Sequence, residues 1–424
     1  SADVRRKTVG LDTLATDTLP AGLSVPAALL GETELAPTTT LPTPGGISIS
    51  PRATGPRVTV LPRVEMVGSE PRVVSEARDR YVSEKKLGEG GLGEVLGARD
   101  QDIGRRVAVK RLRHEVKSDA ALLRFAEEIR TVGKLEHPNI VPVHDVGVDE
   151  QGDHYFVMKY VDGETLETVI QQLAAGDPAY VAKYTVERRV EIFMALCEAA
   201  AFAHAHGIIH RDIKPANVMV GAYGEVVLMD WGVAKVKGAA DPGPASSPAA
   251  LSSAPFAGFS TVAGCIVGTP MYMSPEQSKG QALDERSDVY ALSLLFLELL
   301  TLEHPLEDKP SLEAVIDGIS NDPLPSVLAI CAHGAIPAEL GHFIRRGLQK
   351  DPAARFQSVT AMLDRLRARA TGDIPIECPV TFVKSMTGRW SQFVDRHPMA
   401  AVGAVGLGIA GMIGSVAAAI AVAV

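Results

Sequence analysis

The chain has 424 residues and a formal net charge of −9, from 42 lysines and arginines against 51 aspartates and glutamates. No block of like charges stands out, so the composition excludes the basic footprint of a nucleic-acid-binding protein. The four cysteines are far apart and form no C-x-x-C pair, which excludes a disulfide framework and fits a reducing compartment.

Residues 1–76 predict a disordered arm. They contain no Phe, Tyr or Trp and are rich in Pro, Thr, Ala and Gly. Such a segment buries too little apolar surface to offset the entropy of ordering it. A plain tether is favoured over a segment that carries Ser and Thr modification sites. The first residue is Ser and no cleavable signal peptide is recognisable, so the chain is either a processed product or an excerpt.

A glycine-rich run follows at residues 86–95. Gly88, Gly90 and Gly93 form the pattern G-x-G-x-x-G-x-V between two strand-like segments. Glycines let the backbone turn tightly and approach a phosphate, so that main-chain N–H groups can face it. In a dinucleotide-binding oxidoreductase a helix would come next, whereas residues 95–99 continue as a strand. The pattern therefore favours a loop folded over a nucleotide between antiparallel strands.

The next two segments supply a lysine and a glutamate that could pair with each other. Residues 106–112 alternate between apolar and polar side chains, which predicts a strand with Lys110 on one face. Residues 122–132 have helical spacing with one apolar side. Glu128 lies next to that side and could turn inward to hold Lys110, and Glu127 is the competing choice.

Residues 208–220 contain three side chains with potential catalytic roles close together in the sequence. Asp212, Lys214 and Asn217 lie between two apolar runs. The carboxylate could accept or orient a hydroxyl proton, the ammonium could contact a phosphate, and the carboxamide oxygen could bind a metal. This combination suits phosphoryl transfer, in which positioning and charge neutralisation supply most of the catalysis. A polar turn between two strands is the alternative.

Together these segments resemble a eukaryotic-type serine/threonine protein kinase of the bacterial transmembrane kind. The resemblance covers roughly residues 80–369 and rests on the Gly-rich loop, the Val-Ala-Val-Lys strand that ends at Lys110, and the His-Arg-Asp loop that runs to Asn217. It implies an α+β, two-lobed fold, with an antiparallel sheet and one helix in the N-lobe and a mainly helical C-lobe. The implied boundaries are 77–369 for the domain, 77–160 for the N-lobe and 161–369 for the C-lobe.

The resemblance also implies a binding site for ATP. The Gly-rich loop would cover the phosphates, and Lys110, held by Glu128, would position them. Met158 would be the gatekeeper beside the adenine, and the main chain of Lys159 and Val161 would hydrogen-bond the base. The implied nucleotide-binding residues are Leu87, Gly88, Glu89, Gly90, Gly91, Leu92, Gly93, Val95, Ala108, Lys110, Glu128, Met158, Lys159 and Val161.

Catalytic roles are assigned in the same way. Asp212 would orient the acceptor hydroxyl, and Lys214 would neutralise charge on the moving phosphoryl group. Asn217 and Asp230 would bind Mg²⁺ together with the ATP phosphates. Lys214 and Thr269 together favour Ser or Thr acceptors in protein substrates.

The activation segment is expected at residues 230–276. Trp231 stands where the family pattern has Phe, which leaves the balance between active and inactive states open. Ser260 and Thr261 lie at about the distance from Gly268-Thr269 at which relatives carry activating phosphorylation sites, so the kinase could phosphorylate its own segment. An unmodified insert is the alternative. A nucleotide-sensing pseudokinase is the second hypothesis for the whole domain, and it rests on Trp231 and the length of this segment.

Three further residues match structural positions of the family. Glu276 is expected to pair with Arg355, which lies far along the chain. Asp288 is expected to support the catalytic-loop backbone from a buried helix at residues 289–302.

The C-terminal part is expected to reach a membrane. Residues 370–398 predict a juxtamembrane linker, and residues 399–424 predict a transmembrane helix, because they carry no charge and exceed the roughly 20 residues that cross a bilayer. Trp390 and basic residues precede them, as on a cytoplasmic flank. A buried core helix is the alternative. Small residues spaced by four could pair two such helices in a homodimer. The prediction is a single-pass protein of the cell membrane with a cytoplasmic kinase domain.

Overall fold

The computed structural model describes residues 57–423, except 68, 77, 91–92, 233–234, 237–260, 263–264, 267–269 and 334–335. Residues 1–56 of the predicted arm lie outside the described residues. The end of that arm forms an antiparallel hairpin of β1 (Arg63–Val67) and β2 (Glu70–Val74). Regular structure therefore begins inside residues 1–76, the segment predicted to be a disordered arm. The hairpin escaped that prediction because its apolar side chains stay exposed, as in Val64 and Val73.

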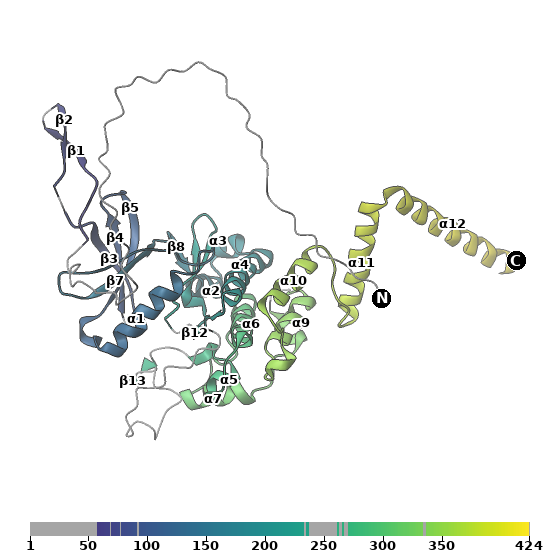
Figure 1. Ribbon diagram of the computed structural model, residues 1–424. Coiled ribbons are helices and arrows are strands. Elements are labelled where there is room, and N and C mark those ends of the chain that lie inside the picture. Colours follow the sequence, from purple (N-terminus) through teal and green to yellow (C-terminus); the bar gives the residue numbers. More distant parts are fainter. Residues whose placement is uncertain are drawn as a thin grey trace, which may run out of the picture. The chain divides into compact units, whose positions relative to one another are not determined.

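Five strands form an antiparallel sheet in the order β3-β4-β5-β7-β6. Their bounds are β3 (Tyr81–Glu89), β4 (Gly93–Asp100), β5 (Arg105–Leu112), β6 (Val143–Val148) and β7 (His154–Lys159). Alternate residues of a strand point to opposite faces. Val107 packs on one face, whereas Ala108 and Phe156 pack on the other against Phe125 of α1 (Asp119–Val132). Lys110 has the parity of Ala108 and so points to the α1 side, where Figure 1 shows this helix beside the sheet.

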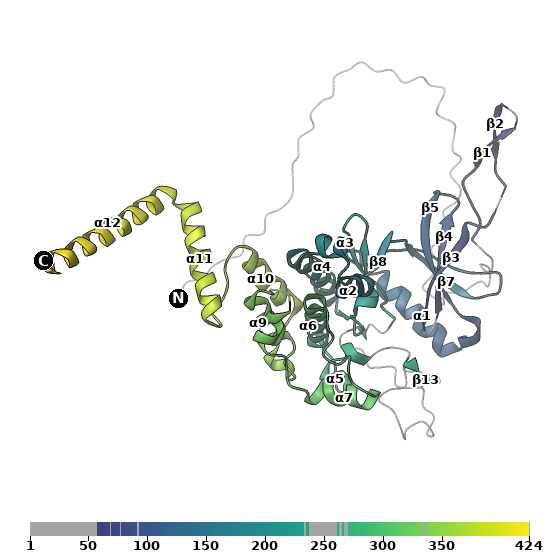
Figure 2. The ribbon, with the colours of Figure 1, turned by 180° about the vertical axis from the view of Figure 1, so that it is seen from behind.

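The second lobe is mainly helical. Its helices are α2 (Leu166–Ala174), α3 (Pro178–Lys183), α4 (Val186–Ala205), α5 (Pro275–Ser278), α6 (Glu285–Thr301), α7 (Leu312–Asn321), α8 (Val327–Ala332), α9 (Ala338–Gly347) and α10 (Val359–Ala370). Short 3-10 turns lie at η2 (His114–Val116) in the first lobe and at η3 (Pro215–Asn217), η4 (Pro270–Tyr272) and η5 (Pro352–Ala354) in the second. α4, α6, α9 and α10 lie side by side in both views (Figures 1 and 2). α6 is buried around most of its circumference, as a central helix must be.

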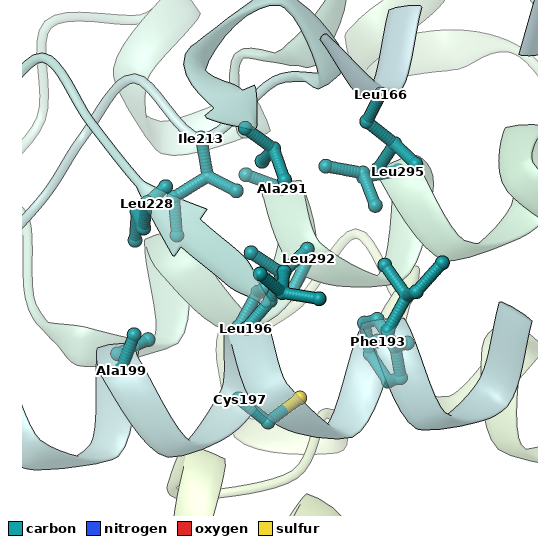
Figure 3. Close-up of a cluster of buried hydrophobic side chains, with 14 of the residues drawn as sticks. Leu166, Phe193, Leu196, Cys197, Ala199, Ile213, Leu228, Ala291, Leu292 and Leu295 are labelled. Atoms are coloured by element: carbon teal, nitrogen blue, oxygen red, sulfur yellow. The ribbon is translucent and has the colours of Figure 1, made fainter. Parts of the chain in front are cut away.

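Local sequence sets both ends of α4. Thr185 caps the first turn by accepting the N–H of Arg188. Gly207 has a φ of 72°, the left-handed conformation that commonly ends a helix. The buried face of α4 packs on α6, where the rings of Phe193 and Phe296 stack with centroids 4.0 Å apart. Figure 3 shows the cluster of buried side chains around Phe193.

Short strands deliver the polar loops of the second lobe. They are β8 (Gly163–Thr165), β9 (Ile208–Ile209), β10 (Val218–Gly221), β11 (Val226–Leu228), β12 (Lys235–Val236), β13 (Thr261–Val262) and β14 (Cys265–Ile266). β11 also joins the two lobes. The N–H of Leu228 donates to the oxygen of Asn139 at 2.8 Å, and its own oxygen accepts the N–H of Val141 at 3.3 Å. The segment after α1 is thereby tied to the strand that leads to Asp230.

The C-terminal region contains two helices, α11 (Pro379–Arg396) and α12 (Pro398–Ala423). α11 occupies the predicted linker. In the part of the chain that the structure describes, no helix combines the length and the apolar character that crossing a membrane requires. The prediction of a transmembrane helix at residues 399–424 is therefore wrong. It rested on the absence of charge, which by itself does not supply the continuous apolar surface that a bilayer crossing needs.

A buried ion pair joins the start of α5 to the turn before α10. Both terminal nitrogens of Arg355 donate to the carboxylate of Glu276 at 2.8 Å, and both side chains are almost completely buried. Ser287 donates to the same carboxylate at 2.7 Å. Burial alone would raise the pKa of Glu276, but the hydrogen bond from Arg355 helps to lower it. The other donors of Arg355 reach backbone oxygens of Arg286, Gln349 and Lys350.

Replacing Arg355 with Met should lower the free energy of unfolding by ~3–5 kcal/mol, because Glu276 would remain as an uncompensated buried charge. The double variant Arg355→Met/Glu276→Gln should recover part of this loss. Urea unfolding followed by circular dichroism measures both. Arg367→Gln is the control: it removes an exposed ion pair with Glu198 and should cost less than ~1 kcal/mol. A similarly small loss in Arg355→Met would contradict the proposed role.

Candidate active site

The catalytic loop is held from inside the second lobe by Asp288 of α6. One carboxylate oxygen accepts the N–H of His210 at 2.8 Å, and the other accepts the N–H of Arg211 at 2.9 Å. His204 of α4 donates to the same carboxylate at 2.7 Å. Burial would raise the pKa of Asp288, but the hydrogen bond from His204, with further help from the N–H of Arg211, lowers it. Arg211 has a φ of 71°, a strained conformation for a non-glycine residue that these bonds stabilise.

His210 connects this loop to the strand before Asp230. Its Nδ1 accepts the N–H of Asp212 at 3.2 Å, so Nε2 carries the proton and donates to the oxygen of Met229 at 3.1 Å. The ring is completely buried. Figure 3 shows that Ile213, on the other side of Asp212, points into the apolar cluster beside Leu228. The loop is therefore fixed on both sides of Asp212.

Asp212, Lys214 and Asn217 converge as their spacing predicted. Lys214 Nζ lies 2.7 Å from Asp212 Oδ2, and Asn217 Nδ2 donates to Asp212 O at 2.8 Å and to Oδ2 at 3.0 Å. The short η3 turn places Asn217 at this distance. The amide nitrogen of Asn217 is thus used inside the loop, and its side-chain oxygen has no partner among the described contacts. Among the described contacts, Oδ1 of Asp212 has no donor and can face an acceptor hydroxyl.

Lys110 lies between two carboxylates from different lobes. Its Nζ is 2.5 Å from Glu128 Oε1 and 3.1 Å from Asp230 Oδ1. Burial acts to lower the pKa of Lys110, but Asp230 and Glu128 outweigh it and the pKa is raised. Burial raises the pKa of Glu128. Burial also acts to raise the pKa of Asp230, but Lys110 outweighs it and lowers this pKa. The structure thus brings Glu128, not Glu127, to Lys110.

The proposed adenine side is formed by β5 and the segment after β7. Met158 and Ala108 are register partners on these strands, and both are buried. The N–H of Lys159 donates to the oxygen of Pro142 at 3.1 Å, so this N–H is not available to a base. Within the described residues, no backbone hydrogen bond uses the N–H of Val161. The main chain of Val161 is therefore the better donor for a nucleotide base.

The Gly-rich loop is the turn between β3 and β4. Gly90 donates its N–H to the oxygen of Gly93 at 2.8 Å, while Gly91 and Leu92 lie outside the described residues. Val95 is the register partner of both Gly88 and Lys110, which brings the loop next to the lysine. The other loop positions of the predicted set, Leu87 and Glu89, are exposed on β3.

Glycine is required at position 93 for a structural reason that the motif did not reveal. A Cβ at this position would lie 2.5 Å from the backbone oxygen of Arg111. No such obstacle surrounds Gly88, where an added Cβ meets nothing within 4 Å. Gly93 therefore permits close pairing of β4 with β5, while Gly88 leaves open space.

Trp231 is buried against the catalytic loop. Its side chain is almost fully buried, and its ring lies 4.5 Å from that of His210. Its Nε1 has no hydrogen-bond partner among the described residues. The larger indole is accommodated while Asp230 reaches Lys110 and Lys110 reaches Glu128. The pair of Lys110 with Glu128 is one of the contacts that an active kinase arrangement needs.

Two contacts of the loop were missed by the sequence reasoning. His204, which supports Asp288, gives no local signal because its partner is far along the chain. Gln277 donates to the oxygen of Arg211 at 2.9 Å and also closes a capping box with Ser274. The S-x-x-Q pattern could have identified the cap, but not the contact with the loop.

The activation segment is described only in part. Ser260 and Thr269 lie outside the described residues. Thr261 belongs to β13, which pairs with β14. The assignment of phosphorylation to Ser260 or Thr261 stays a prediction.

The geometry fits a site for phosphoryl transfer. It combines a lysine paired with a carboxylate, a second carboxylate 3.1 Å from that lysine, and a partly exposed loop aspartate that is held by a lysine and an asparagine. These groups come from both lobes, and they are the parts that an ATP-dependent phosphotransferase requires.

Comparison with known proteins agrees with this class. The family description "Protein kinase domain" matches residues 81–365. Serine/threonine-protein kinase PknB of Mycobacterium tuberculosis is 35% identical over 305 residues, which cover 71% of this chain and 44% of that protein. Serine/threonine-protein kinase PknD of Chlamydia pneumoniae is 33% identical over 301 residues, covering 69% of this chain and 31% of that protein. The crystal structure of the Mycobacterium tuberculosis PknI kinase domain matches with 26% identity and a TM-score of 0.47, covering 67% of this chain and 94% of that one.

The chain belongs to the protein kinase family. The recognition made from the sequence, a kinase similar to the bacterial serine/threonine kinases, is confirmed. The chain spans less than half the length of these two curated relatives.

A partly buried carboxylate, that of Glu298, links the end of the activation segment to α6. The hydroxyl of Tyr272 donates to Glu298, and the ring of Tyr272 meets that of His304 edge-on at 5.0 Å. Burial, with the nearby charges of Glu307 and Glu167, raises the pKa of Glu298 from 4.5 to about 7.

The contribution of Glu298 to the stability of the protein should therefore decrease as the pH rises from 4.5 to about 7. In this window the folded protein keeps a proton on Glu298 that the unfolded chain releases, so the free energy of unfolding falls by at most ~3 kcal/mol. Glu298→Gln should remove this contribution. Urea unfolding across the window compares the two proteins, with the exposed Glu313→Gln as control. Parallel pH profiles for wild type and Glu298→Gln would contradict the assignment.

Proposed function

We propose that this protein transfers the γ-phosphoryl group of Mg-ATP to Ser or Thr hydroxyls of proteins. One observation carries the proposal: Lys110 is paired with Glu128 and lies 3.1 Å from Asp230. This arrangement positions phosphates and a metal in protein kinases. The names of the relatives support Ser and Thr as the acceptors.

The residues present fit Mg²⁺. Asp230 offers a carboxylate and Asn217 a carboxamide oxygen, both hard ligands of the kind that Mg²⁺ prefers, and Mg²⁺ is commonly held by one or two protein ligands together with substrate phosphates. Bound there, the ion would neutralise charge on the phosphates. Lys110 would hold the phosphates from the opposite side, and the loop at Gly88 and Gly90 would cover them with main-chain N–H groups.

Asp212 would orient the acceptor. Its carboxylate is fixed by Asn217 and Lys214, so one oxygen can accept the hydrogen bond of a Ser or Thr hydroxyl and receive its proton as the phosphoryl group moves. Lys214, now paired with Asp212, would neutralise negative charge that develops on the phosphoryl group. On the adenine side, Met158 and Ala108 would contact the base and the N–H of Val161 would hydrogen-bond it.

Substrates are expected to include the activation segment of this same chain, at Ser260 or Thr261. Incubation with Mg-ATP followed by phosphosite mapping tests this. A nucleotide-binding pseudokinase is the second candidate, because Trp231 departs from the family pattern. Less supports it, since the sequence carries every group that the chemistry requires.

Asp212→Asn should lower phosphate transfer by about 10² to 10⁴-fold, the usual contribution of a positioned acid or base. Nucleotide affinity should stay nearly unchanged, because Asp212 faces the acceptor. A radiolabel assay with purified protein and a fluorescent-nucleotide titration measure the two quantities. Asp308→Asn, at an exposed position, is the matched control. Undiminished transfer by Asp212→Asn would refute the mechanism.

A further inference from the structure

Helix α11 packs on the kinase domain with its polar face. Thr381 and Ser385 are almost fully buried. Gln392 donates to the backbone oxygen of Thr371 at 2.5 Å, and a Cβ at Gly388 would come within 2.3 Å of a backbone oxygen in the same turn. The positions 381, 385, 388 and 392 repeat every three or four residues and so share one face of the helix. Small and polar side chains therefore form the docked face.

The apolar side chains of α11 point the other way. Phe382, Met386, Trp390 and Phe393 also repeat at helical spacing, and they are exposed, Trp390 by 45% and Met386 by 58%. The rings of Trp390 and Phe393 lie 5.6 Å apart. A helix of a globular protein normally buries its apolar face. α11 does the reverse, and a contiguous exposed apolar surface marks an interaction site.

The helix that follows continues this surface. α12 contains no charged residue, and its exposed side chains include Met399, Val402 and Leu407. The N–H of Ala401 donates to the oxygen of His397, the residue that joins the two helices. The apolar surface therefore extends over the corner between α11 and α12.

The charged residues of α11 indicate what covers this exposed apolar surface. At about 100° per residue, Arg389 and Arg396 lie along one edge of the apolar face, and neither has an ion pair among the described residues. The third basic residue of α11, Lys384, is paired with Glu339 at 2.9 Å. The single acidic residue of α11, Asp395, lies away from this face at about 100° per residue. A second copy of α11 would bring arginines together without acidic partners, whereas an anionic surface would satisfy them.

We propose that α11 binds flat on an anionic lipid bilayer, with Phe382, Met386, Trp390 and Phe393 among the acyl chains and Arg389 and Arg396 at the headgroups. This is attachment parallel to the surface, not a crossing. Because the opposite face of α11 is docked on the second lobe, binding would hold the kinase domain at the bilayer.

Co-sedimentation of the full chain with vesicles tests the proposal. Phosphatidylcholine vesicles that contain phosphatidylglycerol should bind the protein, and pure phosphatidylcholine vesicles should bind it much less. Trp390→Gln/Phe393→Gln should weaken binding by at least about tenfold, because two large apolar side chains are lost. Leu328→Gln is the matched control, since Leu328 is exposed on α8, outside this face. Phosphorylation of a soluble peptide should be equal in all variants.

The arginines give an independent test. Arg389→Gln/Arg396→Gln should reduce binding to the anionic vesicles by about fivefold for each arginine, and should leave the weak binding to neutral vesicles unchanged. Equal binding of wild type to both kinds of vesicle would overturn the proposal. So would unchanged binding of Trp390→Gln/Phe393→Gln, which would leave α12 as the lipid-binding element. Self-association that this variant abolishes, without any vesicle binding, would identify a second copy as the occupant.

Discussion

The candidate site depends on the hydrogen bonds that the carboxylate of Asp288 accepts. Asp288 lies inside the most buried helix of the second lobe, and it accepts hydrogen bonds from the backbone of His210 and Arg211. A left-handed non-glycine residue costs ~1–3 kcal/mol, and each hydrogen bond to a charged group returns ~1.5–3 kcal/mol. Two such bonds therefore suffice to hold Arg211 in a conformation that it would otherwise avoid. The carboxylate of Asp288 therefore fixes the path of the backbone that leads to Asp212.

A second constraint couples the lobes. Lys110 stands on the sheet, Glu128 on α1 and Asp230 beyond β11, and one ammonium group satisfies both carboxylates. Removing Lys110 would leave the buried carboxylate of Glu128 without its charge partner, and removing Glu128 would leave Lys110 with only the half-exposed Asp230, so these positions depend on one another. Trp231 lies next to Asp230 and packs on His210. The indole thus connects the ion cluster to the loop that Asp288 supports, and the whole site behaves as one packed unit.

The regions outside the kinase core follow a different principle. The β1-β2 hairpin and α11 both expose apolar side chains, and α11 is held to the domain by polar contacts such as that between Lys384 and Glu339. Their sequences did not predict this regular structure, because an interpretation from hydrophobic patterns assumes that apolar residues are buried. α11 was expected to be a linker and the hairpin part of a disordered arm. In both, the tertiary environment decides the structure.

The sequence by itself determined the family, the two-lobed architecture and the candidates for the catalytic groups. Motif spacing sufficed to bring Asp212, Lys214 and Asn217 together, since they are close along a tight turn, and the alternation along residues 106–112 placed Lys110 on one face of its strand. Only the tertiary structure decided between Glu127 and Glu128, revealed His204 and Gln277 as supports, and showed that Gly93 also permits strand pairing. These findings depend on contacts between segments that are distant in the chain. A local sequence pattern does not tell which of those segments lie close together in space. The C-terminal helix was misjudged for a related reason: absence of charge is visible in a sequence, but it does not say which surface a helix faces.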